Sequence, residues 1–202
     1  MVNNFEQIRE LLKFRSNDDF YFLQILQRKK DAKEGQKVNG TNNNSRLVKA
    51  YFIKSIEQYD FIQKEVIGLC ELFNARAGIN LNRRSFYKMA LQHLKKATDQ
   101  ILNGDYDKAH RAYNTVVGAF SNESDKMWIL DIDEKIDVTE MDKLTAYLAT
   151  LQPVGLKQKA IIPSRAGYHL ITSPFRLDEF RKSEFGKDIE VHKNNPTNLF
   201  IP

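Results

Sequence analysis

A regular alternation of strand and helix patterns after Met127 constrains the fold of this 202-residue chain more than any other feature. Short apolar or alternating runs predict strands, and apolar residues that recur three or four apart predict helices. The predicted strands cover 128–133, 159–162, 168–172 and 188–192, and the predicted helices cover 139–151 and 177–185. This order predicts a split β-α-β-β-α-β unit, in which the first and third strands are central neighbours.

The rest of the chain carries further helix and strand patterns without an internal repeat. Helices are expected over 5–14, 56–73, 86–102 and 106–120, and strands over 20–26, 47–53, 77–81 and 199–201. Ser55 and Ser85 precede two of these helices and are typical N-cap residues, and Thr139 could cap the first helix of the C-terminal unit. The Lys-, Gly- and Asn-rich stretch 28–45 is expected to be a surface loop. We therefore expect an α+β fold: a mixed α/β layer at 1–126, packed on a ferredoxin-like or RRM-like unit at 127–202.

Composition and charge exclude several classes of protein. Hydrophobic residues make up 42% of the chain and charged residues 28%, which is ordinary for a globular protein and excludes a fibrous or wholly disordered one. A net charge of +5 is compatible with a polyanionic partner. The single cysteine, Cys70, excludes internal disulfides and a cysteine-based zinc site, and we expect it in a helical core. No apolar run approaches about 18 residues and the N-terminal segment lacks the parts of a signal peptide. We expect a cytoplasmic protein with no membrane partner.

Two carboxylates stand two residues apart at the end of a predicted strand. Asp131 and Asp133 should point to one face of the sheet, while Leu130 and Ile132 point into the core. Carboxylates this close repel each other, and a divalent metal such as Mg²⁺ relieves that repulsion while accepting phosphate oxygens. The alternative is an acidic strand end that runs into a solvated loop.

The turn between the second and third strands of the unit carries groups suited to phosphate. Ser164, Arg165 and the backbone N–H groups up to Gly167 can bind an anion, and His169 follows in the next strand. A lone histidine in such a place can also be a structural hydrogen-bonding residue. Because the first and third strands are predicted neighbours, we expect His169 beside Asp131 and Asp133 on one sheet face.

Three more residues are candidates on weaker grounds. Asp188 opens the fourth predicted strand, which we expect to pair at the sheet edge rather than beside the first strand; it is either a third metal carboxylate or a surface acid. Arg83 and Arg84 are expected to open a helix after a strand, where they could contact nucleic-acid phosphates or lie at a solvated helix start.

Taken in order, three of these segments resemble the catalytic module of the archaeo-eukaryotic primase superfamily, which comprises primases and primase-polymerases. That family has a hydrophobic strand ending in D-x-D, an S-G-R-G-x-H type element, and a later strand with a third acid. The matching segments here are WILDID at 128–133, SRAGYH at 164–169, and Asp188. The resemblance covers about residues 127–202, and Arg165 stands where the family usually has glycine.

The resemblance implies a nucleotidyltransferase that transfers a nucleoside monophosphate from a triphosphate to a nucleic-acid 3′-hydroxyl. The implied catalytic and metal-binding residues are Asp131, Asp133 and Asp188, with two Mg²⁺ or Mn²⁺ ions and no zinc. The implied nucleotide-binding residues are Ser164, Arg165 and His169. The implied partners are nucleoside triphosphates, a DNA or RNA template, and a helicase or another replication protein.

Two other functions fit the same residues. A non-catalytic nucleic-acid-binding or nucleotide-binding protein could keep this fold, with the acids serving structure or a single metal. A metal-dependent nuclease uses similar acids, but it would not need the turn that carries Ser164 and Arg165.

Overall fold

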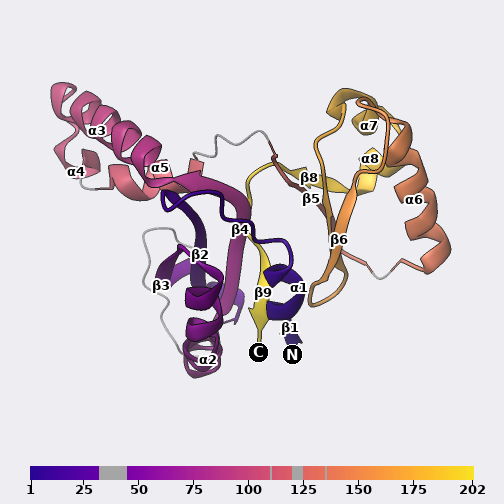
Figure 1. Ribbon diagram of the computed structural model, residues 1–202, viewed down its shortest axis with the longest axis horizontal. Coiled ribbons are helices and arrows are strands. Elements are labelled where there is room, and N and C mark those ends of the chain that lie inside the picture. Colours follow the sequence, from indigo (N-terminus) through magenta and orange to yellow (C-terminus); the bar gives the residue numbers. More distant parts are fainter. Residues whose placement is uncertain (32–44, 110, 120–124, 135) are drawn as a thin grey trace.

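The computed structural model describes residues 1–31, 45–109, 111–119, 125–134 and 136–202 of the chain (Figure 1). The protein is α+β, with two antiparallel sheets of strand order β1-β9-β4-β2-β3 and β6-β7-β5-β8. In the described part of the chain, no helix is long and apolar enough to cross a lipid bilayer.

The first sheet combines the N-terminal part of the chain with its last strand. Its strands are β1 (Val2–Asn3), β2 (Asp19–Arg28), β3 (Ser45–Ile53), β4 (Arg76–Ser85) and β9 (Thr197–Ile201). β2 pairs with β3 and β4, and β9 lies between β4 and β1. Because side chains alternate along a strand, Tyr21 and Leu23 face one side of the sheet and Phe20 and Phe22 the other. Both faces therefore need a helical cover.

The face that carries Tyr21 packs against α1 (Phe5–Arg9) and α2 (Ile56–Phe73). The predicted cap of α2 is confirmed, since the Ser55 hydroxyl accepts a hydrogen bond from the Gln58 backbone N–H at 3.2 Å. Cys70 on α2 is fully buried, and burial raises the pKa of its thiol to about 12. The expectation of a cysteine in a helical core is thus confirmed.

The opposite face packs against α3 (Phe86–Leu102), α4 (Tyr106–Ala109) and α5 (Ala112–Ala119). The rings of Phe20 and Phe86 stack with centroids 4.2 Å apart, and Phe52 meets both. Ser85 caps α3 by accepting from the Lys88 backbone N–H at 3.1 Å, as expected. The helix expected over 106–120 is divided into α4 and α5.

The second sheet contains β5 (Trp128–Ile132), β6 (Gln158–Pro163), β7 (Tyr168–Thr172) and β8 (Glu190–His192). Leu130, Ile132 and Leu170 pack on one face against α6 (Val138–Thr150) and α7 (Leu177–Lys182). The first and third strands of the unit, β5 and β7, are central neighbours as predicted. The expectation that the fourth strand lies away from the first is wrong: β8 is an edge strand that pairs with β5, because β6 already occupies the free edge of β7.

Several element boundaries differ from those expected. Asp137, not Thr139, caps α6, since its carboxylate accepts from the Glu140 backbone N–H at 2.8 Å. α1 ends at Arg9, well before residue 14. The predicted helix over 177–185 ends at Lys182, where the Ser183 hydroxyl donates to the Phe180 carbonyl at 2.6 Å. A separate short helix, α8 (Phe185–Asp188), follows.

Buried amides hold the two sheets together. The Asn4 side chain donates to the backbone carbonyls of Pro163 and Asn198, both at 2.9 Å. The Asn82 side chain donates to the carbonyls of Met127 at 3.0 Å and Lys193 at 2.9 Å. The segment 127–202 thus supplies the whole second sheet, while its last strand, β9, lies in the first sheet. This arrangement places His169, near the start of β7, next to β9.

Candidate functional site

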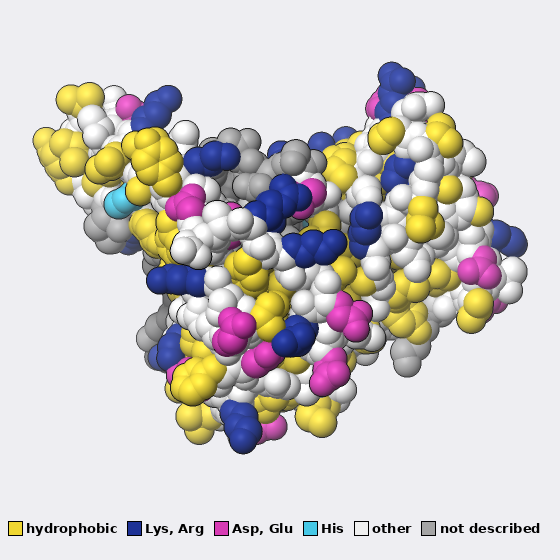
Figure 2. All heavy atoms as spheres, viewed as in Figure 1, with side chains coloured by type: hydrophobic (Ala, Val, Ile, Leu, Met, Phe, Trp, Pro, Cys, Tyr) yellow, Lys and Arg dark blue, Asp and Glu magenta, His cyan; other side chains and the backbone are white. Residues whose placement is uncertain are grey.

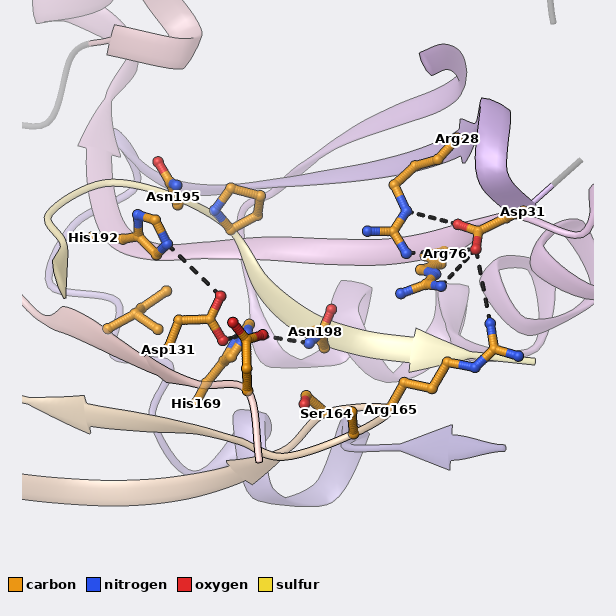
Figure 3. A pocket seen from close by; sticks show the side chains of 14 residues that line it. Arg28, Asp31, Arg76, Asp131, Ser164, Arg165, His169, His192, Asn195 and Asn198 are labelled. Carbon is orange, nitrogen blue, oxygen red and sulfur yellow. Dashed lines mark hydrogen bonds and ion pairs between the residues drawn. The ribbon is translucent and has the colours of Figure 1, made fainter. Parts of the chain in front are cut away.

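A cavity of about 530 Å³ lies where the second sheet meets the first (Figure 3). Five of the residues singled out from the sequence line it: Asp131, Asp133, Ser164, Arg165 and His169. They come from the end of β5, the turn between β6 and β7, and the start of β7. The arrangement brings the D-x-D pair and the turn together, which neither segment shows by itself.

Asp131 and His169 are direct partners across the β5–β7 pair, as the strand order predicted. One carboxylate oxygen, Oδ1, lies 3.3 Å from His169 Nε2. Asp131 is half-buried, whereas Asp133 lies just beyond the end of β5 and is exposed. Both carboxylates line the cavity, so a dication there would meet two oxygen ligands.

The strand β9 orients His169, whose Nδ1 lies 2.9 Å from Thr197 Oγ1 and whose Nε2 lies 3.3 Å from the side-chain nitrogen of Asn198. Burial lowers the pKa of this imidazole; Asp131 opposes that shift and His192 adds to it. Because the pKa of His169 lies below its ordinary value of 6.5, the imidazole is neutral near pH 7.

The turn after β6 is closed by its own hydrogen bonds. Ser164 N–H donates to the Gly167 carbonyl at 2.9 Å, and Gly167 N–H donates to the Ser164 hydroxyl at 3.0 Å. A Cβ at Gly167 would overlap the carbonyl oxygen of Ile132, the last residue of β5. Glycine is needed here because the turn touches the end of the strand that carries Asp131. The turn and the two carboxylates are thus held together by backbone contact.

Three residues on or just after strands of the first sheet, Arg28, Asp31 and Arg76, also line the cavity and were not singled out from the sequence. Asp31 follows β2 in a short 3₁₀ turn (Lys29–Asp31) and is surrounded by guanidinium groups. Its carboxylate lies 2.7 Å from Arg28 Nε, 2.5 Å from Arg76 Nη2 and 3.9 Å from Arg165 Nη1. Figure 3 shows these side chains converging on one side of the cavity. Arg28 belonged to a stretch expected to be a solvated loop, and nothing in its spacing linked it to Arg76.

Burial raises the pKa of Asp31, but the hydrogen bonds from Arg28 and Arg76 outweigh it and hold that pKa below the usual value. Asp31 is therefore ionised at neutral pH and neutralises only part of the charge of three arginines. The cavity keeps a net cationic side that suits a phosphate-rich ligand.

The strand β8 brings a second histidine, His192, to the cavity and a further acid, Glu190, beside that histidine. His192 Nε2 lies 3.8 Å from Asp131 Oδ2 and 3.7 Å from Glu190 Oε2. Glu190 is the direct partner of Asp131 across the β5–β8 pair. Only the register of β8 identifies Glu190 as the acid beside Asp131.

Asp188 is not brought into this cavity. It is the last residue of α8 rather than a strand residue, and it lines a separate cavity of about 640 Å³ together with Asp133 and Glu184. The strand begins two residues later, at Glu190. Among the described residues, no three His, Cys, Asp or Glu side chains form a ready-made metal site.

Arg83 and Arg84 do not open a surface helix. Both lie in β4, which continues to Ser85, and they are only 4% and 1% exposed. Arg83 is paired with Asp19 at 3.2 Å, and its Nη1 donates to the Lys13 carbonyl at 2.7 Å. Arg84 lies over the Phe22 ring. The expectation that both arginines lie at the surface is wrong. Residues from distant parts of the chain bury them, and the local sequence does not indicate these partners.

No protein-family model matches the chain, and neither a curated protein nor a solved structure is significantly similar to it.

Proposed function

We propose that this chain is a metal-dependent nucleotidyltransferase of primase-polymerase type, which transfers a nucleoside monophosphate from a triphosphate to a nucleic-acid 3′-hydroxyl. One observation carries the proposal: a carboxylate pair and a set of arginines beside a hydroxyl-bearing turn line the same cavity. A nucleoside triphosphate needs both, because its phosphates pair with cations and its accompanying dication needs carboxylate oxygens.

The arrangement of the second sheet supports a ferredoxin-like assignment for this unit. β5 and β7 are central, and β6 and β8 are edges, in a β-α-β-β-α-β succession. The likeness to the primase superfamily lies in the segments WILDID and SRAGYH, and the Asp131 and His169 that they contribute are cross-strand partners.

The donor set fits Mg²⁺ or Mn²⁺. These ions take one or two carboxylates and complete their coordination with water and phosphate oxygens, so Asp131 and Asp133 suffice. Glu190 is the acid next to Asp131 on the neighbouring strand. When bound, the metal supplies neutralisation of the triphosphate charge and activation of the attacking hydroxyl.

The side chains of the cavity would then position the triphosphate. Arg165 lies in the turn and is exposed, so it can reach a phosphate while Arg28 and Arg76 stay fixed on Asp31. An incoming polyphosphate raises the pKa of His169 through its negative charge, so this imidazole becomes a donor to a phosphate oxygen on binding. The Ser164 hydroxyl and the backbone of the turn add neutral donors.

The test is incorporation of a labelled nucleotide onto a primer–template duplex with Mn²⁺ or Mg²⁺. We expect Asp131→Asn to lower the rate by at least about a hundredfold, as the loss of a metal ligand should, while folding is unchanged. Asp188→Asn is the matched control, because it removes an acid outside the cavity, and we expect a rate near that of the wild type. Equal losses in both variants would contradict the site as described.

A non-catalytic nucleotide-binding or nucleic-acid-binding protein is the second candidate. The observation that favours it is the lack, within the described residues, of a preassembled group of three metal-binding side chains. In that case Asp131→Asn would leave nucleotide affinity within about threefold of the wild type, and the wild type would incorporate no nucleotide. Degradation of labelled nucleic acid without added nucleotide would point instead to a nuclease.

A further inference from the structure

The helix α3 carries two apolar faces, and only one of them is packed. Phe86 and Met89 belong to the aromatic cluster on the first sheet, and His93 meets the Tyr113 ring edge-on at 5.4 Å. On the other side, Tyr87, Leu91 and Leu94 are 68%, 49% and 62% exposed, and Ile101 is 52% exposed. In Figure 1 α3 and α4 project away from both sheets, and Figure 2 shows hydrophobic side chains gathered over them at the upper left.

The exposed side chains follow the spacing of a coiled-coil seam. The positions 87, 91, 94, 98 and 101 are separated by four, three, four and three residues, which is the a/d spacing of a heptad repeat. Thr98 is the one polar member. A strict a/d seam forms a narrow stripe that fits one partner helix, whereas a helix lying on a membrane needs a broader apolar face.

Lysines flank this seam on one side. With Tyr87, Leu94 and Ile101 at d positions, Lys88 and Lys95 occupy successive e positions, and Ala90 and Ala97 occupy g positions. Within the described part of the chain neither lysine forms an ion pair, so both charges are available to a partner.

These charges oppose a second copy of the chain as the occupant. In an antiparallel pair of α3 helices the e positions face each other, so lysine would meet lysine; in a parallel pair they face the g positions, which here are alanines. Neither arrangement gives Lys88 or Lys95 a carboxylate. A partner helix with glutamates beside its own apolar seam satisfies both lysines.

We propose that the α3 seam (Tyr87, Leu91, Leu94, Thr98 and Ile101) docks an acidic amphipathic helix of another protein, with its carboxylates on Lys88 and Lys95. The seam lies outside the candidate active site, so this proposal is independent of the proposed enzymatic function.

The test uses two synthetic helical peptides of three heptads with Leu at a and d: one carries Glu at e and g, the other Lys. Fluorescence anisotropy is measured with the whole protein. We expect the acidic peptide to bind at least about tenfold more tightly than the basic one. The variant Lys88→Glu/Lys95→Glu should reverse that preference, while Lys64→Glu/Lys143→Glu, which changes two lysines outside the seam, should leave it unchanged.

Thermal unfolding confirms that each variant is folded before its affinity is compared. Leu91→Asp/Leu94→Asp should abolish binding of the acidic peptide. Equal binding of both peptides, or of neither, would overturn the proposal. So would a wild-type dimer in sedimentation that Leu94→Asp dissociates, because the occupant would then be a second copy.

Discussion

Asp31 is the residue through which the two sheets share charge at the cavity. It accepts hydrogen bonds from Arg28 and Arg76 of the first sheet and lies 3.9 Å from Arg165 of the second. Its carboxylate is 7% exposed, so these contacts are poorly screened by water. Asp31 thus holds the side chains of Arg28 and Arg76 in place beside the cavity.

We expect Asp31→Asn to lower the free energy of unfolding by about 1–3 kcal/mol at pH 7, since it removes charge-assisted hydrogen bonds. The pKa of Asp31 is below its ordinary value of 3.8, so its contribution is present above that value and disappears as the pH falls through the lowered pKa. Urea denaturation at pH 7 and near pH 3 checks this. A difference between wild type and variant that does not shrink in acid would contradict it.

Arg83 and Arg84 are neighbours in β4, but we expect their replacement to change the free energy of unfolding in opposite directions. Burial lowers the pKa of Arg84 to about 10, and its Nε and Nη2 have no hydrogen-bond partner in the described structure. We expect Arg84→Met to raise the free energy of unfolding by about 1–3 kcal/mol, because it removes a buried charge that has no counter-ion among the described residues.

Arg83→Met is the matched variant. It leaves Asp19 buried without its charged partner, so we expect the free energy of unfolding to fall by about 3–5 kcal/mol. Thermal unfolding of both variants shows whether the two substitutions change stability in opposite directions. Destabilisation of similar size in the two would show that Arg84 has a counter-charge and that its burial is compensated.

At the scale of elements, the turn between β6 and β7 depends on its contact with β5. Gly167 lies so close to the Ile132 carbonyl that no side chain can be accommodated without moving one strand. The contact holds Ser164 near Asp133 and thereby couples the turn to the carboxylate pair of the cavity.

We expect Gly167→Ala to lower the free energy of unfolding by about 1–3 kcal/mol, through backbone displacement, and to weaken nucleotide binding. Gly68→Ala is the control. Gly68 lies on the exposed side of α2 with open space around it, so alanine should raise the free energy of unfolding by about 0.5–1 kcal/mol. Chemical denaturation of the two variants compares them. If Gly167→Ala left the free energy of unfolding unchanged, the turn would not be packed on β5.

Most elements could be predicted from the sequence, because their apolar residues repeat with a clear period. The helices α2 and α3 and the central pair β5–β7 follow from that period and from the order of elements. β1 could not be predicted, since two residues have no period; it is a strand only because β9 lies beside it. β4 was expected to end at Leu81, where polar residues begin. It continues to Ser85, because partners far along the chain bury those polar residues.

At the scale of the whole molecule, the candidate site depends on how two sheets meet. The side of the site on β5 and β7 could be predicted, since topology places Asp131 beside His169. The side with Arg28, Asp31 and Arg76 could not, because these residues join it only through packing between the sheets. Asp188 was wrongly expected in a strand, since the boundary between α8 and β8 has no signal in the sequence.

The most direct test of the account is thermal unfolding with Mn²⁺ and a nucleoside triphosphate, alone and together, on the wild type and on Asp131→Asn/Asp133→Asn. A ligand at about 100 times its dissociation constant stabilises by about 2.7 kcal/mol, or about 5–10 °C for a chain of this length. We expect a wild-type shift that requires metal and triphosphate together and that the double variant lacks. The same shift in both proteins, or none in the wild type, would contradict a metal–triphosphate site at Asp131 and Asp133.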